Sequence, residues 1–352
     1  MTNFFKMHFF VPLAAVLGLV AIAYFGAQAN LTWVFGVAIP YLTILIFFEG
    51  LIYRIFQWVR SPVPFRIPTT AGQQRSLPWI KKTAKDKLDN PQSFFEVVGR
   101  MALEVLAFRS LFRNTRTEVR KEPDYPEGAR LVHWSYKWLW LGAIAFHYAF
   151  LLVFLRHLRF FSEPTWGFVQ GIATLDGFLD FYTPAIYLTD IILLTALTYL
   201  LARRLANPAV RYISISPDYF PLFLILGIGI TGFIMRYFYR TDITAVKELA
   251  IGLVTFHPVV PAGLSPLFYA HLFLVSVLFA YFPFSKLMHA PGVFLSPTRN
   301  MANNNRWVHY ENPWNYPVKF HTYMDQENEY REAMYEAGIP LEIPPETAEE
   351  KE

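Results

Sequence analysis

Six long apolar segments limit the folds that this chain can adopt. They cover residues 9–27, 32–58, 133–158, 183–202, 217–238 and 266–289. Each is close to the roughly 20 residues that a helix needs to cross a hydrocarbon core of about 30 Å. Charged residues make up only 16% of the sequence, below the roughly 25% of soluble domains. We therefore expect an all-α integral membrane protein, a six-transmembrane helix bundle. The first segment also resembles a signal peptide, and we interpret it as a true span.

The basic residues gather in loops on one side of this bundle. Residues 59–132 contain 14 Lys plus Arg against 8 Asp plus Glu, and Arg203, Arg204 and Arg211 lie in the next loop on the same side. The other side has Arg159, Arg240 and Lys247. The positive-inside rule then places both termini and the 59–132 loop on the cytoplasmic face of the cytoplasmic (inner) membrane. This distribution explains the basic pI without a nucleic acid partner.

Four regions follow from this pattern. Residues 1–58 hold two N-terminal transmembrane helices, 59–132 a cytoplasmic amphipathic loop, 133–290 a four-helix transmembrane region and 291–352 a cytoplasmic C-terminal arm. Within the loop, Ser93 and Glu96 form a capping-box pattern before apolar residues at helical spacing through Asn114. This helix either lies at the membrane interface or docks a cytoplasmic partner. The aromatic stretch NPWNYPVKFHTY favours an arm laid on a partner protein.

Four histidines lie at membrane depth, where an ionisable side chain indicates a functional site. His147 and His157 are ten residues apart on the third segment, and His271 and His289 are eighteen apart on the sixth. These two segments run in opposite directions, so His157 would face His271 and His147 would face His289. Each pair can offer two axial nitrogens to one iron, as a b haem requires.

Helix geometry leaves a second register open. Eighteen residues of helix give about 27 Å and almost no net rotation, but ten give about 15 Å and a turn of about 80° out of alignment. His133 and His147 are only about 40° off one face. In that register His133 would pair with His289 and His147 with His271. A bend at Pro283 is one way to absorb the mismatch of the first register.

The sequence contains no cysteine, which excludes thiolate-bound clusters, disulfides and covalent haem attachment within this chain. The histidines would therefore hold two haem b groups, or form the proton relay of a membrane proton or ion transporter. A third alternative is an anchor subunit without a cofactor, which leaves the paired histidines unexplained. No catalytic residue is expected in the chain itself.

Three stretches, VTFHP, AHLFLVSVLFAYFPFSKLMHAPG and AFHYAFLLVFLRH, together resemble the nitrate reductase gamma-subunit family of dihaem membrane cytochromes b. The resemblance covers roughly residues 32 to 292. It implies that His147, His157, His271 and His289 are the haem iron axial ligands, paired as the antiparallel argument gives. It therefore favours this register over the one that includes His133.

Further stretches, SFFEVVGRMALEVLAFRSLFRNTRTE, HWSYKWLWLG and NPWNYPVKFHTY, resemble the DsrM-type branch of sulfite-reduction-associated complexes, which is related to the cytochrome subunits of membrane heterodisulfide reductases. This branch implies an electron-transfer subunit of a quinol-dependent oxidoreductase in dissimilatory sulfate reduction. The expected partners are menaquinone, bound beside the haem of His157, a cytoplasmic iron–sulfur subunit (DsrK-like) and other membrane subunits. The partner would reduce a heterodisulfide or trisulfide.

Overall fold

The computed structural model describes residues 3–61, 79, 81, 83–120, 128–177, 184–304, 317 and 320–344. Within them, five helical segments are long and apolar enough to cross a membrane: Met7–Gln28, Val34–Val59, Lys137–Phe160, Ser216–Tyr237 and Pro266–Phe284. They correspond to the helices α1 (Asn3–Gln28), α2 (Ile39–Val59), α6 (Lys137–His157), α10 (Ser216–Tyr237) and α12 (Pro266–Tyr281). A π-helical turn, Val34–Ala38, precedes α2. The chain is thus a mostly helical, multi-pass membrane protein.

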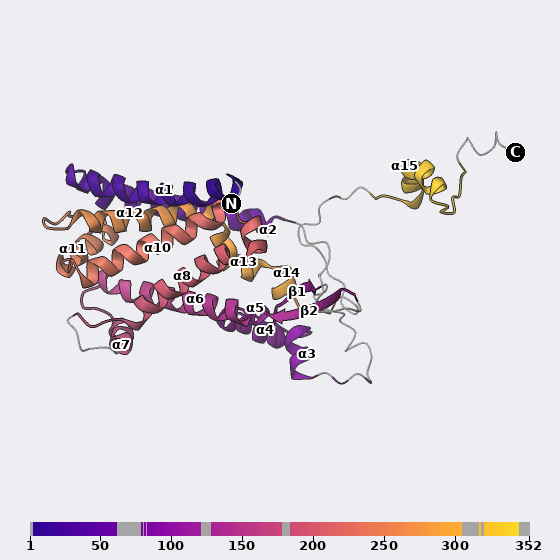
Figure 1. The fold of residues 1–352 in the computed structure, drawn as a ribbon, viewed down its shortest axis with the longest axis horizontal. Coiled ribbons are helices and arrows are strands. Elements are labelled where there is room, and N and C mark those ends of the chain that lie inside the picture. The colour runs from indigo at the N-terminus through magenta and orange to yellow at the C-terminus, as the bar shows by residue number, and fades with distance from the viewer. Residues whose placement is uncertain are drawn as a thin grey trace.

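The segment expected at 183–202 differs from these five. It forms α8 (Leu188–Ala206), and its start at residue 183 lies outside the described residues. Every 18-residue stretch of this helix contains Asp190, Arg203 and Arg204, whereas each of the five other segments has a stretch of that length with at most two charged residues. Even so, α8 packs against α6 and α10 in the bundle, as Figure 1 shows.

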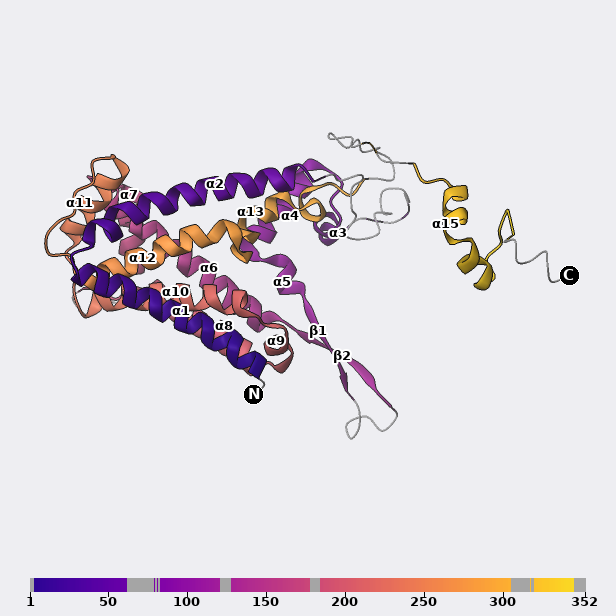
Figure 2. The same ribbon diagram turned by 90° about the horizontal axis from the view of Figure 1, so that it is seen from above.

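The helices of the bundle are held together by buried apolar side chains. α1 packs on α10 and α12, α10 packs on α12, and α2 lies along α12 (Figures 1 and 2). Tyr219, Leu224 and Leu274 are fully buried between α1, α10 and α12. Leu193, Leu197 and Ile225 pack with Ala149 where α6, α8 and α10 meet. This packing fixes α6 and α12, which carry three of the four membrane histidines, in one rigid unit.

Short elements close the two ends of the bundle. At one end lie α7 (Gly167–Asp176) and α11 (Ile243–Val254). The other, here called the N-terminal end, carries α3 (Ala84–Asp89), α4 (Phe94–Ala107), α5 (Arg109–Arg113), α9 (Pro208–Ile213), α13 (His289–Leu295) and α14 (Pro297–Asn300) (Figures 1 and 2). The helix α15 (Tyr323–Glu336) lies apart from the bundle in both views. Residues 305–316 of the expected arm lie outside the described residues.

A β-hairpin interrupts the expected all-α class. Strands β1 (Thr115–Arg120) and β2 (Arg130–Ser135) pair antiparallel, with His133 opposite Thr117. The sequences TRTEVR and RLVHWS contain β-branched and aromatic residues, which suit a pleated strand. The expected helix 93–114 is also shorter than predicted, because Phe108 has left-handed backbone angles of φ 49° and ψ 45° and separates α4 from α5.

The start of α4 agrees with the capping pattern, with one shift. The Ser93 hydroxyl accepts a hydrogen bond from the Glu96 backbone N–H at 3.4 Å. The Glu96 carboxylate accepts from the Gln92 backbone N–H at 2.7 Å, one residue before the position that a capping box uses. The first turn of α4 is therefore capped from both sides.

Candidate functional site

The structure brings His147 and His289 together near the N-terminal end of the bundle. Their ring centres are 6.0 Å apart and the ring planes are perpendicular. His147 Nδ1 donates to the Ala143 carbonyl at 2.7 Å, and His289 Nδ1 donates to the Lys286 carbonyl at 2.9 Å. A carbonyl oxygen only accepts, so each Nδ1 carries the proton. In the neutral ring Nε2 then keeps a lone pair that can bind a metal.

His157 and His271 form the second pair, toward the other end of α6 and α12. Their ring centres are 6.4 Å apart and the planes are 17° from parallel. His157 Nδ1 donates to the Val153 carbonyl at 2.7 Å. His271 Nδ1 lies 2.9 Å from the hydroxyl of Thr231, which itself donates to the Gly227 carbonyl at 2.8 Å. Thr231 therefore accepts from His271, and the tautomer is the same in all four rings.

Both separations fit two imidazoles that share one metal. Metal–imidazole bonds are about 2 Å long, and with roughly 1 Å from each nitrogen to its ring centre they place two such rings about 6 Å apart. The described residues contain no cluster of three or more His, Cys, Asp or Glu side chains that could hold a bare ion. A group that supplies the remaining ligands itself, as a porphyrin does, matches a pair of histidines.

His289 reaches His147 because the last span is broken. α12 ends at Tyr281, and two 3₁₀ turns, Phe282–Phe284 and Lys286–Met288, carry the chain to His289 at the start of α13. Pro283 has no N–H for a helical bond, and Ser285 is extended at φ −123° and ψ 176°. The expectation of one helix through 289 is thus wrong, although the bend at Pro283 was anticipated.

Phe108 contacts the first pair from a segment that the sequence gave no reason to place there. Its ring lies edge-on to the His147 ring, with centres 4.9 Å apart. The adjoining backbone is bonded to α6: Trp140 Nε1 donates to the Ala107 carbonyl at 2.7 Å, and the Tyr148 hydroxyl donates to the Leu106 carbonyl at 2.8 Å. The turn between α4 and α5, here called the elbow (Leu106–Phe108), is therefore attached beside His147.

An ion network lies next to His157. Arg156 Nε is 3.0 Å from Asp176 Oδ2, and Arg156 Nη2 is 2.5 Å from Asp190 Oδ1. The side chain of Arg156 is only 6% exposed. The ring of Tyr187 lies between two guanidinium groups, 3.7 Å from that of Arg156 and 3.8 Å from that of Arg236. These paired charges tie α6, α7, α8 and α10 together beside the second pair.

His133 does not join either pair. It lies on β2, so the alternative register, in which it pairs with His289, does not correspond to the arrangement in the structure. Among the glycines of α10, a Cβ on Gly232 would lie 3.2 Å from His271 Cε1, whereas one on Gly229 would meet Leu194 at 3.0 Å. Gly232 thus gives the His271 ring its space, and Gly229 serves helix packing.

Comparison with known proteins finds relatives along most of the chain. The family described as "Nitrate reductase gamma subunit" matches residues 94–310, which include both histidine pairs. A protein of Archaeoglobus fulgidus named "Hdr-like menaquinol oxidoreductase cytochrome b-like subunit" is 46% identical over 285 residues, 80% of this chain and 83% of the relative. A protein of Archaeoglobus profundus with the same name is 43% identical over 281 residues, 79% of this chain and 81% of the relative.

Proposed function

Because this chain belongs to the nitrate reductase gamma-subunit family, we propose that it is the dihaem cytochrome b subunit of a respiratory sulfur-metabolism complex. It passes electrons between menaquinol and a cytoplasmic iron–sulfur (DsrK-like) subunit that acts on a heterodisulfide or trisulfide. The observation that carries this proposal is the presence of two histidine pairs, with imidazole ring centres 6.0 Å apart in one and 6.4 Å apart in the other.

The chain's own residues would hold two haem b groups in defined places. His147 and His289 would ligate one iron, and His157 and His271 the other. When bound, such haems supply one-electron transfer, because two axial imidazoles leave the iron no open position for a substrate. The hydrogen bond on every Nδ1 fixes each ring in the ligating tautomer. A proton relay would instead need ring nitrogens that are free to exchange protons in turn, which favours electron transfer over transport.

The orientation follows from the charges of the loops. The 59–132 loop has 14 basic against 8 acidic residues, and Arg203, Arg204 and Arg211 add to the same end of the bundle. By the positive-inside rule this end faces the cytoplasm, with both termini, and α8 serves as the sixth span. His147 and His289 are then nearer the cytoplasmic partner, and His157 and His271 are nearer the opposite surface, where menaquinol would bind.

Haem quantitation in single histidine variants tests the proposal. A reduced-minus-oxidised spectrum with a pyridine haemochrome assay should give two b haems per chain in the parent protein. His147→Ala and His289→Ala should each lose the same haem, and His157→Ala and His271→Ala the other. His133→Ala is the matched control and should keep both. A parent chain without haem, or a haem lost in His133→Ala, would contradict the proposal.

A further inference from the structure

The exposed residues of α4 are all apolar. Phe94, Phe95, Val98, Ala102, Leu103 and Leu106 form one stripe along the helix, here called the outer stripe. The side chains of Phe94 and Phe95 are 73% and 82% exposed, and that of Leu106 is 60% exposed. Four of the six residues recur at steps of four, so they follow one helical face for about three turns.

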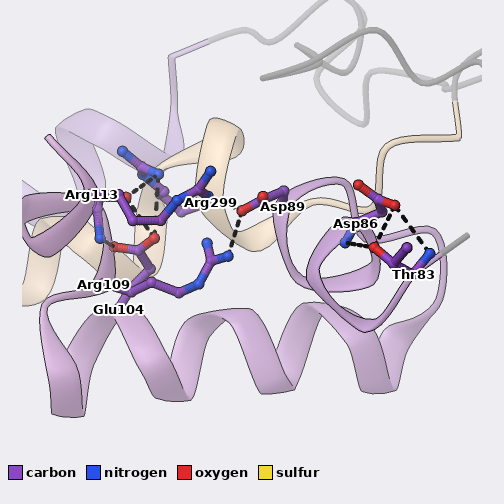
Figure 3. Close-up of polar contacts among 8 residues, drawn as sticks. Thr83, Asp86, Asp89, Glu104, Arg109, Arg113 and Arg299 are labelled. Atoms are coloured by element: carbon purple, nitrogen blue, oxygen red, sulfur yellow. Dashed lines mark hydrogen bonds and ion pairs between the residues drawn. The ribbon is translucent and has the colours of Figure 1, made fainter. Parts of the chain in front are cut away.

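Two of the three charged residues of the same helix, Arg100 and Glu104, face the protein, and the third, Glu96, caps its first turn. Arg100 is only 4% exposed. Glu104 has an 8% exposed side chain, accepts from the Ser110 hydroxyl at 2.6 Å and lies 3.5 Å from Arg299. Beside them, Arg109 is 2.5 Å from Asp89 (Figure 3). A helix that borders water has its charges outside and its apolar residues inside. α4 has the reverse arrangement, which suits a lipid environment.

The C-terminal end of α4 lies alongside a membrane span. Tyr148, whose hydroxyl bonds the Leu106 carbonyl, is eleven residues beyond the start of α6 at Lys137, roughly 16 Å along that helix. Tyr148 is 42% exposed, and Leu151 and Phe154 beyond it are 48% and 49% exposed. The outer stripe is therefore continuous, through Leu106 and Tyr148, with the exposed apolar surface of α6.

Three carbonyls near the C-terminal end of α4 have the kind of partner that a helix end inside a bilayer needs. The Leu103 carbonyl accepts from the Phe108 backbone N–H, the Leu106 carbonyl from Tyr148 and the Ala107 carbonyl from Trp140. In water these carbonyls could bond solvent, but in hydrocarbon each unsatisfied group costs several kcal/mol. Two large side chains of a membrane span thus replace water at the end of this helix.

We propose that α4 is a re-entrant helix inserted into the lipid bilayer, with its outer stripe against the acyl chains and the elbow as its deepest point. Lipid is favoured over a protein partner because the stripe continues the surface of a membrane span and because Arg100 and Glu104 are turned inward. The inserted elbow brings Phe108 against His147. The inference rests on the membrane topology and does not require that the histidines bind haem.

Site-directed spin labelling tests this directly, because the chain contains no cysteine and each single-cysteine variant carries one label. The variants Phe95→Cys, Ala102→Cys and Leu106→Cys would be labelled as the purified chain, before assembly with unlabelled partner subunits in lipid nanodiscs. Collision rates of the nitroxide with oxygen, which concentrates in lipid, and with a water-soluble nickel chelate are then compared. Leu151→Cys on α6 serves as the lipid reference and Glu336→Cys on α15 as the water reference.

We expect the oxygen-to-nickel collision ratio to rise from Phe95 to Leu106 and to reach that of Leu151 at Leu106. A ratio at Ala102 and Leu106 equal to that of Glu336 would overturn the proposal, because the stripe would border water. Low collision rates with both reagents would also overturn it, because a protein partner would then cover the stripe. The haem spectrum of the same samples reports separately on the proposed function.

Discussion

Thr231 offers the sharpest test of the second histidine pair. Three of the four histidines donate Nδ1 to a backbone carbonyl, which no substitution removes. His271 alone also has a side-chain partner, the Thr231 hydroxyl at 2.9 Å, beside the Ile228 backbone carbonyl. Thr231→Val keeps the shape of the residue and deletes this bond. The effect should therefore be confined to the haem held by His157 and His271.

The size of the effect follows from the strength of one hydrogen bond. A bond from Nδ1–H makes the imidazole a stronger donor to iron and so favours the oxidised, more positive metal. Its net contribution is about 0.5–1.5 kcal/mol. For a one-electron couple, a tenfold change in equilibrium constant is about 59 mV. The loss of the bond should then raise the midpoint potential of this haem by roughly 20–65 mV.

A redox titration followed by the haem absorption bands measures both midpoints in one sample. Thr198→Val is the matched control, because the Thr198 hydroxyl makes the same bond to a carbonyl four residues earlier, that of Leu194 at 2.8 Å, from the exposed side of α8. The reasoning would be refuted by a midpoint that stays unchanged in Thr231→Val. An equal shift in Thr198→Val, or a shift of the other haem, would refute it as well.

Three further predictions concern other parts of the chain. Gly50→Ala should lower the content of the haem held by His147 and His289 and cost about 1–3 kcal/mol of stability, because the new Cβ would lie 2.7 Å from Pro283 Cβ. A haemochrome assay and thermal inactivation measure the two effects. Gly18→Ala is the control and should change neither, because a Cβ at Gly18 would have nothing within 4 Å. Phe108→Ala and Phe108→Gly should alter the spectrum of that haem alike, but the glycine variant should be more stable by about 1 kcal/mol, because it relieves a left-handed backbone; equal stabilities would contradict this. The amide-exchange protection factors of Glu342 and Ile343 should fall at acidic pH, because their backbone N–H groups, Glu342 first, hold the pKa of Glu327 below its ordinary value. This stabilisation is present above the unfolded pKa of about 4.3 and is lost as pH falls through the lower folded pKa, so the protection factors in Glu327→Gln should not depend on pH in this way.

The family resemblance indicated which histidines meet, after the spacing had left two registers open, and the opposite directions of the two spans agree with it. The spacings of ten and eighteen residues lie on two spans of opposite direction, so each histidine had a counterpart at its own level. The helix arithmetic was less useful. It assumed one continuous helix from His271 to His289, whereas the chain leaves helical geometry at Phe282–Met288. The register therefore depends on a turn, and a rotation calculated along a helix cannot describe it.

The elbow and the direction of α4 could not be predicted in the same way. A period of 3.6 shows that a helix has one apolar face, but it does not show whether that face meets a protein core or lipid. The contacts of Leu106 and Ala107 with α6 are structural evidence for lipid that the sequence does not contain. The left-handed conformation of Phe108 was also hidden, because glycine, and less often asparagine or aspartate, is the usual signal for that geometry. The basic charges of the 59–132 loop indicate its side of the membrane, but they do not indicate the hairpin within it.

The two histidine pairs are built from different kinds of structure. His157 and His271 lie on the regular spans α6 and α12, and their supports also belong to regular spans, Val153 to α6 and Thr231 to α10. His289 follows a broken helix and begins α13, which is followed by α14. Arg299 of α14 donates to the Ser110 hydroxyl on α5 at 2.8 Å. α5 adjoins the elbow whose Phe108 contacts His147 (Figure 3 shows Arg299 among these groups). Short segments at the N-terminal end therefore adjoin the first pair, and His289 itself remains exposed. A contact made by a partner at this end can therefore reach the first pair, whereas the second pair lies toward the opposite end of α6.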